Sequence, residues 1–411
     1  MKVLWFEVTT PAKYKDGGIV IGGWQDSLES IVRGISEIEL YVVFESKEES
    51  AIKKIDGVTY IPIYLKYNWF ERQKKKWSWT LYANKVKSAA IRVVNKVRPD
   101  LIHCFGSEWL WGLVAEETKI PCVIHIQGSI VPYMNAQFPP GYNEYTVAEA
   151  IPRKIFSIWK QRLWTQSWVE NEKRVWKVVN NYMGRTDWDY ALVKIMNPTA
   201  SYFHVEEALR PSFFNGVKKW KISTESKIRL VSTGCTTFWK GPDMMLKTAN
   251  ILKKIGVDFE WIVCGRMDST VKKVVERREK LSFCDCNIRF LGYIQPDDLV
   301  DLLCNSSIFV HTAYIENSPN SICEAQILGV PIVSTNVGGI STLIQNSGIL
   351  VPANDPWQMA YAITELAANK EKCQALSGQG IRIANNRHAP ANIKEQLLNC
   401  YSQIISNNTT L

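Results

Sequence analysis

The sequence has no long hydrophobic run, few histidines and no paired cysteine motif, and each absence excludes a class of protein. No apolar stretch among the 411 residues approaches the ~20 that cross a bilayer, so we expect no membrane-spanning helix. Ten cysteines are scattered, and Cys284 and Cys286 lie too close together to share one ion. We therefore expect reduced structural thiols and a cytoplasmic protein. The N-terminal residues match a strand and lack the cleavage site of a signal peptide, in line with that expectation.

Two cofactor motifs are also absent. Gly17-Gly18 and Gly22-Gly23 follow the first predicted strand, where glycine lets the backbone approach a ligand closely. Their spacing differs from the G-x-G-x-x-G fingerprint, so a nicotinamide cofactor is not expected. No Asp-x-Asp motif occurs in a plausible loop, and we therefore expect no requirement for a divalent metal ion.

The chain is long enough for two domains, because 411 residues exceed the size of a single hydrophobic core. Predicted strands and helices alternate in two series, which indicates an α/β fold with parallel, doubly wound sheets. We predict two Rossmann-like domains joined near residues 211–220. In such sheets ligands bind beyond the carboxyl ends of the strands, and the cleft between the domains is the expected site.

The elements are predicted from hydrophobic periodicity and turn residues. The first series has strands at 2–8, 40–44, 58–63, 101–104, 121–127 and 180–183, helices at 74–98, 109–118 and 159–179, and a loop at 132–151. The second has strands at 228–233, 259–264 and 288–291 and helices at 242–255, 271–281 and 297–304. A last amphipathic helix is predicted at 390–405.

Positive charge is concentrated in one segment. The formal net charge is +9, and residues 66–98 carry about one basic residue in three, interleaved with aromatic residues. This combination suits the headgroup region of an anionic membrane, and it equally suits a solvated helix face over a domain core. No nucleic-acid-binding motif accompanies the segment, so nucleic acid is not an expected partner.

The stretch from residue 308 to residue 335 reads as strand, loop, helix, turn and strand. Two carboxylates belong to it: Glu316 in the loop and Glu324 in the first turn of the helix. The amide groups at the start of such a helix can hold a diphosphate. Two structural interpretations compete with a functional one, because Ser321 and Glu324 can form a capping box and Glu316 can be a solvated loop charge.

Four motifs follow one another in a characteristic order. Gly22-Gly23-Trp24 comes first, Lys240-Gly241 second, Glu316-x7-Glu324 third and Gly338-Gly339 last. Together they resemble the retaining glycosyltransferases of family four, which have the GT-B fold, and the resemblance spans nearly the whole chain. Residues 184–210 are similar to the interdomain region of bacterial surface-polysaccharide members of that family.

The resemblance implies a role for each motif. Glu324 would hold the ribose hydroxyls of a nucleotide sugar, and Glu316 would contact and orient the transferred sugar. Lys240 would neutralise the leaving phosphates, the electrostatic role expected where negative charge develops. The other donor contacts would come from Gly22 and Gly23 near the phosphates, Asn320 and Ser321 at the helix start, and Gly265, Arg266, Tyr293 and Ile294 near the base.

One departure from the family pattern concerns the phosphates. Members usually carry an arginine five residues before the lysine, where this chain has Cys235. Arg185 and Arg266 are candidates for the missing contact, and Lys240 is expected to carry more of the phosphate charge than the pattern normally requires.

A second departure concerns the end of the strand at 121–127. Family members often have histidine there, whereas this chain has Gln127, which we assign to the catalytic residues. We interpret His125 as a buried histidine on the other face of the strand. His103 is interpreted as a structural or acceptor-side residue.

The resemblance implies transfer of a hexosyl residue, with retention of configuration, from a nucleotide sugar, expected to be a UDP-sugar. The acceptor would be a glycan or a lipid-linked glycan at the inner membrane face, in surface-polysaccharide biosynthesis. Residues 1–217, with a C-terminal helix at 388–411 packed back on them, would bind the acceptor, and residues 218–387 would bind the donor. Two alternatives stay open: a sugar-nucleotide epimerase of the same shape, and a non-catalytic nucleotide-sugar-binding protein.

Overall fold

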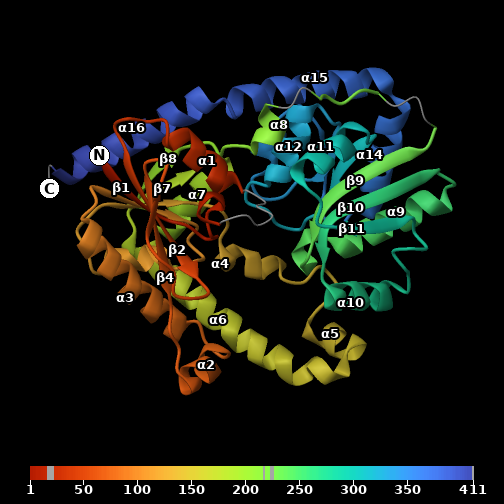
Figure 1. Cartoon of the computed structure of the whole chain (residues 1–411). Coiled ribbons are helices and arrows are strands. Elements are labelled where there is room, and N and C mark those ends of the chain that lie inside the picture. Colours follow the sequence, from red (N-terminus) through yellow and green to blue (C-terminus); the bar gives the residue numbers. More distant parts are fainter. Residues whose placement is uncertain (16–22, 216–217, 223–225, 410–411) are drawn as a thin grey trace. The chain divides into compact units, whose positions relative to one another are not determined.

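The computed structural model describes residues 1–15, 23–215, 218–222 and 226–409 (Figure 1). These residues divide into two compact units. The first unit comprises Met1–Pro132, Trp159–Ala208 and His388–Leu411, and the second comprises Tyr133–Ile158 and Leu209–Arg387, without the positions left undescribed. The predicted C-terminal helix is therefore part of the first unit.

The boundary between the units differs from the expected one in two places. Residues 133–158, which the sequence placed in the first domain, belong to the second unit, as do residues 209–215. The reason is side-chain packing: Tyr142, Val147 and Phe213 lie in the hydrophobic core of the second unit. The Tyr142 hydroxyl also donates a hydrogen bond to Glu279 at 2.5 Å. Periodicity along the chain carries no information about which core such a segment joins.

The first unit contains an eight-stranded sheet with the order β3-β4-β2-β1-β5-β6-β7-β8. Its pairs are parallel except for β3 with β4, an edge hairpin that the sequence did not predict. The strands are β1 (Lys2–Phe6), β2 (Glu39–Ser46), β3 (Lys53–Ile55), β4 (Val58–Tyr64), β5 (Leu101–Phe105), β6 (Cys122–His125), β7 (Asn181–Gly184) and β8 (Ser201–His204).

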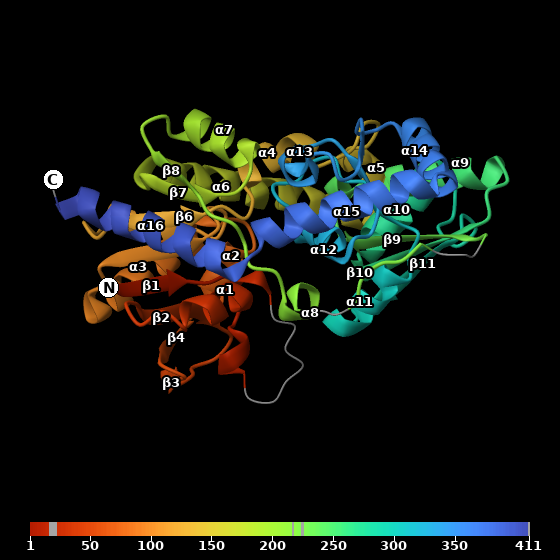
Figure 2. The ribbon, with the colours of Figure 1, turned by 90° about the horizontal axis from the view of Figure 1, so that it is seen from above.

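Helices cover both faces of this sheet, because successive side chains of a strand point to opposite faces. Leu4 and Phe6 pack into the core beneath α3 and α6, whereas Val3 and Trp5 pack into the core beneath α1 and α16. Figure 2 shows the ribbon of these elements from above. The helices are α1 (Trp24–Val32), α2 (Trp69–Lys75), α3 (Thr80–Val97), the 3-10 helix η2 (Trp111–Glu116), α4 (Ile130–Tyr133), α6 (Ile155–Val178), α7 (Asp187–Met196) and α16 (Pro390–Thr409).

The helix predicted at 74–98 is two helices, α2 and α3. Asn68 caps α2, and its side chain accepts a hydrogen bond from the Glu71 amide, so this helix begins earlier than predicted. The chain turns before α3, where the backbone amide of Trp79 donates to the Ser167 hydroxyl at 2.8 Å. The Trp79 side chain is buried in the core beneath α3 and α6, and this tertiary packing replaces a continuous helix.

The second unit contains a six-stranded sheet, parallel throughout, with the order β11-β10-β9-β12-β13-β14. The strands are β9 (Ile228–Cys235), β10 (Phe259–Met267), β11 (Ile288–Gly292), β12 (Ile308–His311), β13 (Ile332–Thr335) and β14 (Ile349–Val351). The chain fills one side of β9 first and then returns to the other side with β12. The switch point of this doubly wound sheet therefore lies between β9 and β12.

The helices of the second unit pack with this sheet around one hydrophobic core (Figure 1). They are α5 (Glu144–Ala150), α8 (Pro211–Phe214), α9 (Pro242–Lys254), α10 (Ser269–Glu279), α11 (Pro296–Cys304), α12 (Asn320–Leu328), α13 (Ile340–Ile344), α14 (Pro356–Ala368) and α15 (Lys370–Arg387), with short 3-10 helices at Met134–Ala136, Pro152–Lys154 and Phe238–Lys240. The segment interpreted as a loop at 132–151 contains α5. In the described part of the chain, no helix is both long and apolar enough to cross a membrane.

Candidate functional site

Two loops bring Lys240 and Glu316 together at the switch point of the second unit. Lys240 ends the short helix after β9, and Glu316 lies in the loop after β12. The Lys240 ammonium donates to Glu316 Oε1, and His311 Nε2 lies 3.4 Å from the same oxygen. Since the side chain of Glu316 is only 7% exposed, the solvated loop charge considered above does not describe it.

The charge state of Glu316 follows from these neighbours. Burial raises the pKa of this carboxyl, but the charge of Lys240 and the hydrogen bond and charge of His311 outweigh burial and lower the pKa to about 2. Glu316 is therefore ionised at neutral pH. A buried carboxylate held beside an ammonium group at a switch point can accept hydrogen bonds from hydroxyl groups of a ligand.

Two glycines allow these loops to approach each other. A Cβ at Gly241, which has φ +71°, would lie 1.9 Å from the carbonyl oxygen of Thr312. A Cβ at Gly338, with φ +54°, would lie 1.6 Å from the carbonyl oxygen of Glu316, which also accepts from the Gly339 amide at 3.2 Å. Both positions need the left-handed conformation and the missing side chain of glycine.

Helix α12 begins directly after this loop. Asn320 is its first residue and Ser321 its second, and the N-cap position is Pro319, whose side chain makes no capping hydrogen bond. The capping-box interpretation therefore does not hold, and the expected place of Glu324 in the first turn is wrong: Glu324 is the fifth helical residue and does not reach back to cap the helix start. The N-terminal dipole and the first-turn amides remain oriented toward the Glu316 loop, an arrangement that attracts anions.

Glu324 is bound by an arginine that the sequence did not point to. Arg210 donates from Nε to Glu324 Oε1 at 2.8 Å, and its Nη2 lies 2.8 Å from the same oxygen. The guanidinium also lies over the Phe213 ring at 4.7 Å. Burial raises the pKa of Glu324, and Arg210 opposes that rise. Arg210 precedes Glu324 by more than a hundred residues, so no local motif signals the pair.

The residues expected near the base lie at the ends of neighbouring strands. Gly265 of β10 pairs with Gly292 of β11, and Arg266 follows on β10, whereas Tyr293 and Ile294 follow β11. Arg266 and Tyr293 are exposed, and Ile294 packs partly against the core. Gly265, with φ +93°, lies against the backbone of Gly234 on β9.

Cys235 ends β9 and is buried. Burial raises the pKa of its thiol to about 12, although the charge of Lys240 favours the thiolate. The thiol is therefore neutral at physiological pH and does not bring the positive charge that an arginine would bring to a phosphate. Arg266 is the other candidate in this unit, and its contact with phosphate stays a prediction.

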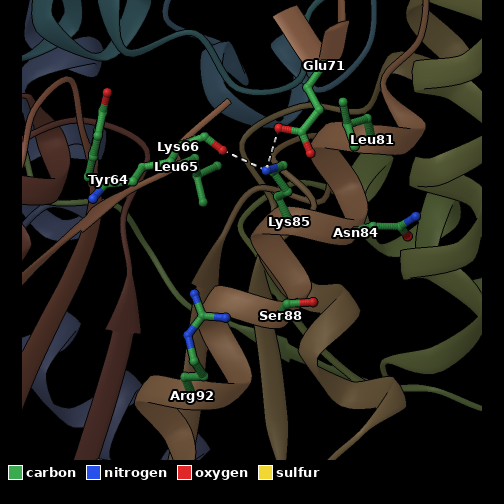
Figure 3. Close-up of a pocket in the computed structure, with 9 residues that line it drawn as sticks. All are labelled: Tyr64, Leu65, Lys66, Glu71, Leu81, Asn84, Lys85, Ser88 and Arg92. Carbon is green, nitrogen blue, oxygen red and sulfur yellow. Dashed lines mark hydrogen bonds and ion pairs between the residues drawn. The ribbon is translucent and has the colours of Figure 1, made fainter. Parts of the chain in front are cut away.

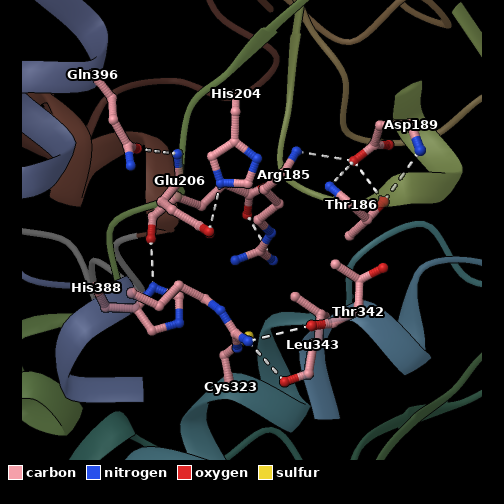
Figure 4. A network of polar contacts seen from close by, with 12 residues as sticks. Arg185, Thr186, Asp189, His204, Glu206, Cys323, Thr342, Leu343, His388 and Gln396 are labelled. Atoms are coloured by element: carbon pink, nitrogen blue, oxygen red, sulfur yellow. Dashed lines mark hydrogen bonds and ion pairs between the residues drawn. The ribbon is translucent and has the colours of Figure 1, made fainter. Parts of the chain in front are cut away.

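Arg185 belongs to a buried network of the first unit (Figure 4). Its Nη2 lies 3.2 Å from Glu207 Oε2, and its backbone amide donates to Asp189 Oδ2 at 3.0 Å. Asp189 also accepts from the Thr186 amide and hydroxyl at 3.0 and 2.8 Å. Asp187 and Asp189 have Asp-x-Asp spacing, but they lie in the first turn of α7, where Asp189 completes a capping box with the N-cap residue Thr186. The network gives Arg185 a structural role, and a phosphate role stays a prediction.

The other candidates of the first unit lie after β1, within β5, and at or just after the end of β6. Gly23 is the N-cap of α1, and its amide donates to Asp26 at 2.9 Å; Gly22 lies outside the described residues. His103 is fully buried, with Nδ1 2.7 Å from the Tyr401 hydroxyl, and burial lowers its pKa well below the ordinary value. This environment favours the structural interpretation of His103.

His125 and Gln127 differ in environment. His125 is fully buried, and burial followed by the charge of Arg185 lowers its pKa to about 3, so the imidazole is neutral. Gln127 is partly exposed, but its amide nitrogen, Nε2, is buried and has no hydrogen-bond partner among the described residues. The catalytic role of Gln127 stays a prediction.

The sequence did not predict two buried carboxyls, Glu108 and Glu172, near the segments that follow β5 and β6. Glu172 accepts from the Ser107 hydroxyl at 2.7 Å and from the Val131 amide at 2.9 Å, which ties together the segments after β5 and β6. Burial and the charge of Glu172 raise the pKa of Glu108 to about 8. Neither residue lies in a recognisable motif, because their interaction depends on tertiary packing.

Metal ligands do not cluster in the described part of the chain. No group of three or more histidine, cysteine, aspartate or glutamate side chains there could hold an ion. The expected independence of a divalent metal nevertheless stays a prediction.

The sequence of the second unit matches a known family. Residues 227–369, which contain Lys240, Glu316 and Glu324, match the model described as glycosyl transferases group 1. The D-inositol 3-phosphate glycosyltransferase of Salinispora tropica is 26% identical over 181 residues, or 42% of this chain and 37% of that protein. The amylovoran biosynthesis glycosyltransferase AmsK of Erwinia amylovora is 24% identical over 192 residues, or 44% of this chain and 45% of that protein. The alignments thus span less than half the length of these curated relatives.

Solved structures are similar over nearly the whole chain. Sucrose-phosphate synthase from Thermosynechococcus elongatus superposes with a TM-score of 0.73 at 15% identity, covering 99% of both chains. HepE of Anabaena, in complex with UDP and glucose, superposes with a TM-score of 0.65 at 13% identity, covering 98% of this chain and 99% of HepE. These likenesses confirm the predicted fold class: two α/β units with parallel sheets, as in GT-B glycosyltransferases.

Proposed function

We propose that this protein is a retaining glycosyltransferase of family four that transfers a hexosyl residue from a nucleotide sugar to a glycan or lipid-linked acceptor. The observation that carries the proposal is the buried Glu316–Lys240 pair beside the N-terminus of α12, at the switch point of the second unit. The match of residues 227–369 to group 1 glycosyl transferases supports it. The UDP and glucose bound by HepE support a UDP-sugar as the donor.

Each side chain has a chemical task in this proposal. The diphosphate binds at the first turn of α12, where Asn320 and Ser321 lie, and Lys240 neutralises the charge that develops on the leaving phosphate. Glu316 accepts hydrogen bonds from hydroxyls of the transferred sugar. When the sugar binds, its hydroxyls replace the hydrogen bond that Lys240 donates to Glu316. The nearby Lys240 ammonium keeps the Glu316 carboxylate ionised.

The reaction breaks one bond and forms another on the same face of the sugar. The bond from the anomeric carbon to the diphosphate oxygen breaks, and that oxygen keeps the electron pair. The acceptor hydroxyl oxygen bonds to the anomeric carbon from the side that the diphosphate leaves, and its proton passes to the leaving phosphate. Glu316 is engaged by Lys240 and serves binding in this scheme, so no covalent glycosyl intermediate is needed.

Glu324 is proposed to hold the ribose of the donor. The carboxylate already has Arg210 on one oxygen, which fixes its orientation and keeps its charge balanced when water is displaced. A ribose diol can then use the other oxygen. Arg210 replaces the water molecules that would otherwise solvate Glu324. We expect loss of Arg210 to weaken donor binding and to leave the rate of the chemical step unchanged.

The acceptor side of the proposal is supported by the basic and aromatic composition of residues 66–98 and by the similarity to AmsK. We propose a role in surface-polysaccharide synthesis and peripheral contact with an anionic membrane at its inner face. Flotation with vesicles that contain anionic lipid, at low salt, tests the contact. Failure to float with such vesicles would argue against it.

The activity is tested by a transfer assay with purified protein, a panel of UDP-sugars and a lipid-linked glycan acceptor. Glu316→Gln is expected to reduce turnover at least a hundredfold, in line with loss of a group that positions the reacting sugar. Arg277→Gln, on the exposed face of α10, is the matched control and keeps wild-type turnover. Near-normal transfer by Glu316→Gln would contradict the site, and formation of an epimer of the donor without acceptor would favour an isomerase.

A further inference from the structure

A pocket of about 530 Å³ lies on the first unit at the carboxyl edge of its sheet. Glu45 comes from the end of β2, Tyr67 follows β4 and Trp109 follows β5. This is the edge at which parallel sheets of this kind bind ligands. The other lining residues come from α2, the turn before α3, α3 itself and α6: Arg72, Lys75, Lys76, Ser78, Trp79, Tyr82 and Trp164.

One wall of the pocket is a packed aromatic cluster. Trp79 stacks on Trp168 with ring centroids 4.6 Å apart, and it meets Tyr82 and Trp164 edge-on at 4.8 and 5.2 Å. These rings hold one another in place, so the wall is formed before any ligand arrives. Flat, rigid apolar walls of this kind suit a hydrocarbon chain.

The polar groups of the pocket are donors and cations. Trp79 is 9% exposed, and its indole N–H has no partner among the described residues; the same holds for the buried Tyr67 hydroxyl. Lys75 lies over the Tyr67 ring at 4.3 Å, and Arg72 lines the pocket beside it. The lining carboxylate, Glu45, already accepts from the Tyr82 hydroxyl at 2.9 Å. A ligand that satisfies these groups must bring acceptor oxygens and negative charge.

A second pocket, of about 450 Å³, lies along α3 and differs from the first in its polar groups (Figure 3). Its central cation, Lys85, donates to the Lys66 carbonyl oxygen at 2.6 Å and pairs with Glu71 at 3.0 Å. The charge of Lys85 is therefore answered within the protein, and that pocket has a single aromatic lining residue, Tyr64. The larger pocket differs in its buried donors, Trp79 Nε1 and the Tyr67 hydroxyl, which have no partner among the described residues.

We propose that the larger pocket binds an amphiphilic phosphate, with its hydrocarbon chain against Trp79 and Trp164 and its phosphate at Tyr67, Arg72 and Lys75. Trp69 and Phe70 are 66% and 77% exposed on α2, the helix that also carries Arg72, and exposed aromatic residues are expected where such a ligand is taken from a bilayer. The assignment of this ligand as the lipid part of the acceptor rests on the proposed function, whereas binding itself does not.

The test is calorimetric titration of the full chain, without any donor, with decyl phosphate below its micellar concentration. Three control compounds are titrated in the same way. Decanol carries the hydrocarbon chain alone, inorganic phosphate carries the charged group alone, and decyl glucoside is an uncharged sugar amphiphile. We expect decyl phosphate to bind at least tenfold more tightly than each of the three. Equal affinity for decanol would overturn the phosphate site, and tighter binding of decyl glucoside would identify a sugar subsite instead.

Variants locate the site. Lys75→Gln is expected to weaken decyl phosphate binding about tenfold, since a phosphate loses a charged donor, and Tyr67→Phe severalfold. Lys74→Gln is the matched control, because Lys74 lies on the same helix, is exposed and does not line the pocket. The same loss in Lys74→Gln as in Lys75→Gln would overturn the proposal in favour of non-specific charge attraction. A protein that binds decyl phosphate but transfers no sugar would contradict the proposed function alone.

Discussion

At the scale of single residues, Glu316 and Glu324 have opposite electrostatic settings. Lys240 and His311 more than offset the burial of Glu316, and the pKa of Glu316 falls to about 2. Burial dominates at Glu324, and its pKa rises despite Arg210. The two acids belong to one sequence motif, but their pKa values shift in opposite directions. The reason is that each has a different partner from a distant segment, Lys240 for Glu316 and Arg210 for Glu324.

The lowered pKa of Glu316 predicts a pH dependence of stability. Since this pKa is lower in the folded than in the unfolded chain, Glu316 stabilises the fold above about pH 4.5, and this is lost as the pH falls toward 2. From pKa values of about 2 and about 4.5, the contribution is roughly 3 kcal/mol at neutral pH. We expect the difference in free energy of unfolding between wild type and Glu316→Gln, measured in urea, to shrink below pH 4.5. A difference that is constant from pH 7 to pH 3 would contradict the ion pair.

Arg210 and Glu324 are predicted to be energetically coupled. Their side chains are 19% and 7% exposed, so removal of one partner leaves a poorly solvated charge. A double-mutant cycle with Arg210→Gln and Glu324→Gln should give a coupling of roughly 2 kcal/mol in unfolding free energy. The matched control is the pair of Lys218 and Asp301, whose side chains are 65% and 50% exposed and which should couple by less than about 1 kcal/mol. Equal coupling in both pairs would refute the distinction.

At the scale of elements, the site depends on close backbone packing of the loops that follow β9 and β12, which carry Lys240 and Glu316. The Gly338 backbone lies against the carbonyl of Glu316, and Gly241 lies against Thr312. Helix α12 is held by Arg387 of α15, which donates to Gln326 at 3.0 Å and to the Leu343 carbonyl oxygen at 2.8 Å. The second contact is drawn in Figure 4. These contacts tie the last turn of α12 to α13 and α15.

Gly338→Ala is predicted to displace the Glu316 loop. The new methyl group would lie 1.6 Å from a backbone oxygen, so the loop must move in addition to adopting a strained φ. We expect a loss of roughly 3 kcal/mol in unfolding free energy and of donor binding measured by calorimetry. Gly256→Ala is the control, because Gly256 has φ +78° but no atom within 4 Å of the added carbon, and should lose only about 1–2 kcal/mol. Similar losses in both variants would show that φ strain alone accounts for the effect.

The secondary elements were largely predictable, and the errors have both long-range and local causes. The buried parallel strands at 228–233 and 308–310 correspond to β9 and β12, since continuous β-branched runs are typical of such strands. The division of the predicted helix at 74–98 depends on a distant segment, through the contact of Trp79 with Ser167, and Glu324 binds the distant Arg210 instead of capping its helix. The antiparallel β3 is different, because it pairs with β4 across the local turn at Asp56-Gly57, a hairpin signal that we missed.

At the scale of the whole molecule, a nucleotide that binds the folded chain must stabilise it. At a concentration one hundred times its dissociation constant, a ligand adds about 2.7 kcal/mol to the free energy of unfolding. We expect UDP and UDP-sugars to raise the thermal midpoint in EDTA as much as in manganese, and Glu324→Gln to reduce the shift. A screen that includes GDP, ADP and dTDP sugars identifies the base. A shift that requires manganese would contradict metal-independent donor binding.

The sequence by itself determined the α/β class, the two series of strands and the approximate places of Lys240, Glu316 and Glu324, because periodicity and turn residues act over short distances along the chain. Only the tertiary structure decided that Lys240 pairs with Glu316, that Arg210 pairs with Glu324 and that residues 133–158 belong to the second unit. It also gathered the donors of the pocket that includes Tyr67 and Trp79. Such pairings depend on distances across the fold between residues far apart in sequence, and no local pattern encodes those distances.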